Sequence, residues 1–140
     1  MGCIYTGIAN RHYRNGVFKI GQTKDKYPTG RLNANGLSCI YYLSVPNATG
    51  IELDLLEAFA RYTCQEIGLS PQYSDTKDWF RYNIDKRFTC QESQAERFAI
   101  AVMQRLIQEC QQMGIKYEIR ACYLKGKRYT CSAAKVLDVI

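Results

Sequence analysis

The feature that most constrains the fold is an Asn-Gly pair between two apolar runs near the start of the chain. Residues 3–10 (CIYTGIAN) and 17–21 (VFKIG) are rich in β-branched and aromatic side chains, and Asn15 and Gly16 lie between them. Both of these residue types accept the positive φ angles of a tight hairpin turn. The sequence therefore predicts that the chain begins with an antiparallel hairpin, which commits its first residues to a sheet.

Turn signals divide the next part of the chain into a helix and a strand. Pro28 suits the first turn of a helix and Asn35-Gly36 is a helix stop, so we expect a short helix over about 28–34 that carries Arg31. Residues 38–45 (SCIYYLSV) are predicted to form a third strand, which Pro46-Asn47 ends.

A longer helix is expected over residues 48–68, with Gly68 as its stop signal. At about 100° per residue, one arc holds Glu52 together with apolar or small side chains, namely Leu53, Leu56, Phe59, Ala60, Thr63, Cys64 and Ile67. The opposite arc, where a solvated face is expected, holds Asp54, Glu57, Arg61 and Gln65. Glu52 is thus a carboxylate on the apolar side of an otherwise amphipathic helix. It is either a first-turn acid that the helix dipole stabilises at the rim of the core, or a functional group.

The second half of the chain shows fewer turn signals and one clear helix. We expect an edge strand through Trp79-Phe80 and then a helix over 92–114, whose apolar residues recur on one stripe and whose entry, TCQE, has capping-box spacing. The tail alternates well enough for one or two strands around Lys125-Gly126. The predicted class is α/β of the α+β type, with a small mixed or antiparallel sheet flanked by helices.

Composition limits the class of protein. The chain has 140 residues, of which 46% are hydrophobic and 23% are charged, so we expect one globular domain over 1–140. It has no apolar run of about 18 residues and no basic-then-apolar leader, so neither a membrane span nor secretion is expected. The seven cysteines include no CxxC pair, which disfavours a zinc knuckle and fits a reduced, cytoplasmic protein. The net charge of +6, with eleven tyrosines, favours a polyanionic partner.

Several chemically capable residues follow one another in a recognisable order. Tyr5 lies in the first predicted strand, Lys19-Ile20-Gly21 ends the second, and Arg31 and Glu52 lie on the next two predicted helices. In this order the chain resembles the GIY-YIG endonuclease superfamily, with CIY in place of GIY and KIG in place of YIG. The closer likeness is to a divergent phage and bacterial branch, whose second motif is Y/F-K-I-G-x-T and whose later strand carries a W-F pair.

This resemblance covers about residues 3–84 and leaves 85–140 as a C-terminal extension of a helix and strands. It implies a GIY-YIG-like fold and a metal-dependent DNA endonuclease. In that function Glu52 would bind Mg²⁺ or another divalent cation such as Mn²⁺, Arg31 would contact the scissile phosphate, and Tyr5 would act as the base or assist it. A tyrosine, whose pKa is about 10, is a weak base at neutral pH unless a cation beside it favours the phenolate. Lys19 is expected to supply that cation.

The remaining candidate residues are assigned to substrate binding. Gly21 is expected to leave room for the phosphate backbone, and His12 and Tyr13 in the hairpin loop to touch the substrate, although a turn glycine and exposed loop residues would look the same in the sequence. DNA is the expected partner, and RNA stays open. The basic stretch KGKR at 125–128 is either a phosphate contact or a solvated turn.

A second function stays open on the same fold. The chain can also be interpreted as a catalytically inactive module that binds nucleic acid or protein, such as a phage protein acting on a host partner. Tyr5, Lys19, Arg31 and Glu52 together favour the enzyme, because a binding module has no need of a carboxylate among basic groups that face phosphate.

Overall fold

In the part of the chain that the structure describes, one antiparallel sheet carries two long helices. The computed structural model describes residues 1–9, 16–28, 30, 37–73, 76–85, 87, 91–125 and 128–133. Its elements, in chain order, are β1 (Cys3–Ala9), β2 (Val17–Thr23), β3 (Leu37–Ser44), α2 (Gly50–Glu66), β4 (Ser70–Tyr73), β5 (Thr76–Arg81), α3 (Gln91–Met113), β6 (Glu118–Lys125) and β7 (Arg128–Ala133). The strand order is β4-β5-β2-β1-β3-β6-β7, and every neighbouring pair is antiparallel. The expected α+β class is confirmed, with the sheet antiparallel rather than mixed.

The N-terminal hairpin forms as the sequence predicts. Strands β1 and β2 are antiparallel neighbours, in register from Cys3 opposite Thr23 to Ile8 opposite Phe18. Gly16, directly before β2, has a φ of 83°, which L side chains rarely adopt. Its carbonyl also accepts a hydrogen bond of 2.8 Å from the backbone N–H of Tyr82, which ties the start of β2 to the end of β5.

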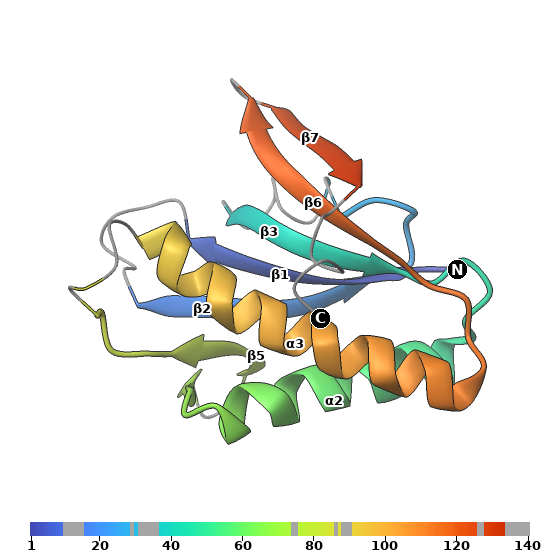
Figure 1. The fold of residues 1–140 in the computed structure, drawn as a ribbon, viewed down its shortest axis with the longest axis horizontal. Helices are drawn as coiled ribbons and strands as arrows, with labels where there is room; N and C mark the ends of the chain where they lie inside the picture. The colour runs from blue at the N-terminus through green and yellow to red at the C-terminus, as the bar shows by residue number, and fades with distance from the viewer. Residues whose placement is uncertain are drawn as a thin grey trace.

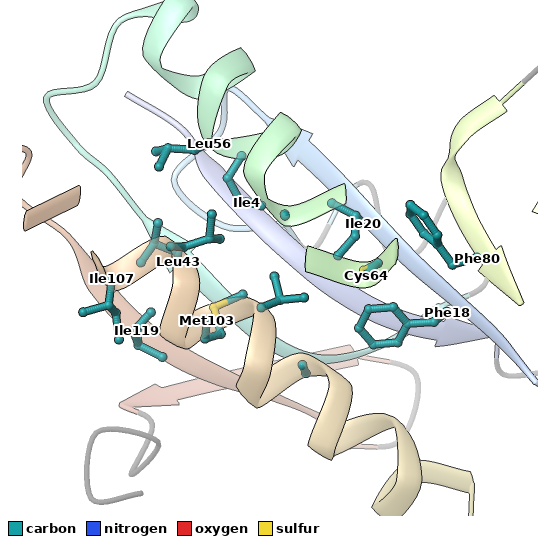
Figure 2. Close-up of a cluster of buried hydrophobic side chains, with 14 of the residues drawn as sticks. Ile4, Phe18, Ile20, Leu43, Leu56, Cys64, Phe80, Met103, Ile107 and Ile119 are labelled. Carbon is teal, nitrogen blue, oxygen red and sulfur yellow. The ribbon is translucent and has the colours of Figure 1, made fainter. Parts of the chain in front are cut away.

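Helices α2 and α3 both cover the same face of the sheet (Figure 1). Figure 2 shows the side chains that fill the layer between sheet and helices, with Ile4 and Ile20 from the strands and Leu56 and Met103 from α2 and α3. Successive residues of a strand point to opposite faces. The even-numbered residues of β1 and β2, such as Ile4 and Ile20, therefore face the helices, and the odd-numbered ones face away.

Strand β5 lies inside the sheet, which makes the expected edge strand through Trp79-Phe80 wrong. It pairs with β4 on one side and β2 on the other, and Phe80 is buried. The edge is β4, whose Pro71 suits that position because proline cannot donate a ladder hydrogen bond. The four residues of β4, SPQY, are too short and too polar to show as a strand in the sequence.

Residues of the C-terminal part, 85–140, contribute to the same hydrophobic core as the residues before them. Strand β6 pairs with β3, and α3 buries Val102, Met103 and Leu106 against the sheet. Both of the strands expected in the tail are present as β6 and β7. The short helix expected over 28–34 and the capping-box residue expected at position 89 lie outside the described residues, apart from Pro28 and Gly30.

Candidate functional site

Three residues from the two N-terminal motifs lie on the sheet face that is turned away from the helices. In the β1–β2 ladder Tyr5 is opposite Gly21 and Gly7 is opposite Lys19, so all four share that face. A methyl group built on Gly21 would overlap the ring and hydroxyl of Tyr5. The space left by the glycine is therefore occupied by the Tyr5 ring, whereas the sequence analysis assigned it to a phosphate backbone.

Lys19, on the same face, packs against a tryptophan of the next strand. Lys19 is only 8% exposed, and its Nζ lies 4.6 Å from the centroid of the Trp79 ring. The two residues are cross-strand partners in β2 and β5. Cation–π contacts of this kind contribute up to about 2 kcal/mol when they are shielded from water. Tyr5 and Lys19 are diagonal neighbours in adjacent strands, which places their Cα atoms roughly 7–8 Å apart. We call Tyr5, Lys19, Gly21 and Trp79 the tyrosine–lysine group.

A further aromatic pair continues this face of the sheet. Tyr42 of β3 is the cross-strand partner of Tyr5 and is fully buried. The ring of Tyr27 packs edge-on against Tyr42, with the ring centroids 6.5 Å apart. Tyr27 precedes Arg31 by four residues in the sequence. Arg31 itself, like His12 and Tyr13, lies outside the described residues.

Glu52 lies on the helical side of the sheet and not with Tyr5 and Lys19. It is the N3 residue of a capping box, in which the backbone N–H of Thr49 donates to Glu52 Oε1 (2.9 Å) and the backbone N–H of Glu52 donates to Thr49 Oγ1 (3.1 Å). Burial, Glu109 and then Glu52 raise the pKa of the Cys110 thiol in α3 to about 11. The T-G-I-E spacing from Thr49 could have revealed this box.

The carboxylate that is directed into the sheet from α2 is Glu57, which the sequence analysis placed on a solvated face. Glu57 is 8% exposed and pairs with Arg61 one turn later at 3.0 Å. The Gln22 side-chain amide, on the helical side of β2, donates both to Glu57 Oε2 and to Asp54 Oδ1. The half-buried Gln22 amide thus bridges two carboxylates of α2 to the sheet. Helical periodicity alone does not reveal such a partner on a distant strand.

A polar pocket of about 560 Å³ opens at the junction of β2 and α2. It is lined by Gln22, Thr23, Lys24, Asp25, Gly50, Leu53 and Asp54. In the part of the chain that the structure describes, no three His, Cys, Asp or Glu side chains lie close enough together to hold a metal ion.

Comparisons with protein-family models, with curated proteins and with solved structures gave no match. Among the described residues, neither helix is long and apolar enough to pass through a bilayer.

Proposed function

We propose that this chain is a DNA endonuclease that hydrolyses phosphodiester bonds at the tyrosine–lysine group. The observation that carries the proposal is the meeting of Tyr5, Lys19 and Gly21, from two separate motifs, on one face of the sheet. A cation beside a phenol favours the phenolate. In this proposal the Tyr5 hydroxyl, on a side chain that is 2% exposed, is the group that takes the proton of an attacking water, and the Lys19 ammonium stabilises negative charge that develops on the phosphate.

The proposed chemistry at the tyrosine–lysine group does not depend on a divalent cation bound by Glu52. Mg²⁺ is bound by carboxylates and keeps several waters, but Glu52 uses one carboxylate oxygen in its capping box and lies on the helical side of the sheet. We therefore assign no step to a metal ion held by Glu52. Whether cleavage depends on Mg²⁺ or Mn²⁺ is measured directly in the nicking assay.

The position of Glu52 favours a second candidate function. The tyrosine–lysine group does not include Glu52, and its side chains are basic or aromatic. Such a surface suits a module that binds nucleic acid without cleaving it. The net charge of +6 supports the same partner. A cytoplasmic setting is part of both proposals, and the free thiols of Cys3, Cys64 and Cys110 support it.

Nicking of a supercoiled plasmid, with Mg²⁺ and with EDTA, tests the nuclease. We expect Tyr5→Phe to lower the rate by about 100-fold or more, because general bases contribute at least that much. Glu52→Gln keeps an oxygen that accepts the Thr49 N–H, so its rate is expected to stay within a few-fold of wild type. Thr49→Ala is the matched control, since it weakens the same cap and keeps the carboxylate. Loss of cleavage in Glu52→Gln alone would restore Glu52 as the metal ligand.

Salt-dependent binding separates the two candidate functions. Fluorescence anisotropy with a labelled duplex is expected to give an affinity that falls with salt, with a log–log slope of about −0.9 for each phosphate neutralised. Tight, salt-sensitive binding without nicking would identify a binding module. Absence of both nicking and salt-sensitive binding would exclude nucleic acid as the partner.

A further inference from the structure

Two cysteines are direct cross-strand partners in the C-terminal hairpin. In the ladder between β6 and β7, Cys122 is opposite Cys131. Directly opposite residues in an antiparallel pair have Cα atoms about 5.5 Å apart at a hydrogen-bonded position and about 4.5 Å apart at the other position. Both spacings fall within the roughly 4.4–6.8 Å that a disulfide requires. The Cα spacing of the pair therefore lies within the range of a disulfide bond, and the shorter Cβ spacing of a non-hydrogen-bonded position suits the bond better.

The hairpin places this pair away from the buried core. Cys122 comes three residues after Ile119, the residue of β6 that belongs to the core cluster. Strand β7 is the last strand of the sheet, and Figure 1 shows the β6–β7 hairpin projecting beyond the layer formed by α2 and α3. The pair thus lies at the margin of the sheet.

The sequence around the pair is basic. Residues 119–137 contain five basic residues and no acidic one, namely Arg120, Lys125, Lys127, Arg128 and Lys135. Two cysteines of the core are poor nucleophiles, because the thiolate is the reactive form and burial raises the pKa of Cys64 to about 12 and of Cys110 to about 11. The hairpin pair is therefore the place where oxidation is expected.

We propose that Cys122 and Cys131 are an oxidation site that forms a reversible disulfide with hydrogen peroxide as the oxidant. One thiolate attacks the peroxide, the O–O bond breaks, and a sulfenic acid forms. The second thiol displaces water from that sulfenic acid and completes the S–S bond. In total, two thiols lose two electrons and two protons, and one peroxide becomes two waters. A small dithiol reverses the bond by thiol–disulfide exchange.

Tryptic mapping tests this proposal, because Lys125, Lys127 and Arg128 lie between the two cysteines. The full-length protein is treated with peroxide, its remaining thiols are alkylated, and it is digested without reductant. We expect the peptides spanning residues 121–125 and 129–135 to be recovered as one linked species, which separates on reduction. Alkylated Cys64 and Cys110 peptides are expected from the same digest after unfolding.

Two serine variants serve as the matched pair. Cys122→Ser is expected to abolish the linked species, and Cys90→Ser, which leaves both hairpin cysteines in place, is expected to retain it. Amide hydrogen exchange across β6 and β7 is expected to slow on oxidation of the wild type but not of Cys122→Ser. Separate alkylated peptides after full oxidation, or a link from Cys122 to any other cysteine, would overturn the proposal.

Discussion

At the residue scale, the contact between Tyr5 and Gly21 shows why a glycine ends the KIG motif. The two residues face each other across β1 and β2, and the tyrosine ring covers the position that any larger residue would need. The glycine therefore fixes the place of the phenol, on the face of the sheet that Lys19 shares. This role depends on the cross-strand register and not on the conformation of the turn that follows.

We expect Gly21→Ala to destabilise the protein by about 1–3 kcal/mol, as overpacking in a tight interior does. Gly50→Ala is the matched control, because nothing lies within 4 Å of the added methyl group and the expected change is within about 0.5 kcal/mol. Urea unfolding measures both. In a Tyr5→Ala background the cost of Gly21→Ala is expected to fall toward zero; an unchanged cost would mean that the ring is not the obstacle.

At the scale of single elements, helix α2 carries its carboxylates in two different roles. Glu52 closes the capping box at the N-terminus, whereas Glu57 is buried one turn later between Arg61 and Gln22. The amphipathic pattern of the helix accounts for Leu53, Leu56 and the other apolar residues. It does not account for Glu57, whose burial depends on Gln22 of β2.

Glu57→Ala is expected to lower the free energy of unfolding by about 1–3 kcal/mol, because it removes an acceptor from the half-buried amide of Gln22 and a partner from Arg61. Glu66→Ala, on the same helix, removes an exposed partner of Arg105 at 3.4 Å and is expected to change stability by less than about 1 kcal/mol. Thermal and urea denaturation followed by circular dichroism compare the two. Equal losses would contradict a structural role for Glu57.

At the scale of the whole molecule, the two helices share one layer against a single sheet. Helix α3 contributes Val102, Met103 and Leu106 to the same core cluster as Ile4 and Leu56. The core therefore combines residues from about 3–84 with residues of the helix that follows them.

A chain ending at residue 84 is accordingly expected not to fold by itself. Removal of α3 would expose the apolar face of β1 and β3 that it covers, and a loss of several buried Leu-sized side chains, each contributing about 1.5–3 kcal/mol, exceeds the stability of an ordinary domain. One-dimensional proton NMR and a denaturant titration, with the full chain as control, provide the measurement. A cooperative transition in the short chain would show that residues 3–84 are an independent unit.

The sequence by itself determined the local elements. The turn at Gly16, the strands β1, β2 and β3, the helices α2 and α3, and two strands in the tail were all predictable, because backbone preferences and apolar periodicity act over a few neighbouring residues. The capping box of Thr49 and Glu52 was also present in the sequence as a local spacing.

Only the tertiary structure decided which residues meet. The grouping of Lys19 with Trp79, the burial of Glu57 against Gln22, the inner position of β5 and the separation of Glu52 from Tyr5 all depend on strand order and on the face that the helices cover. These relations join residues that are far apart in the chain. They follow from burying one face of a sheet under two helices, and no local pattern specifies that choice.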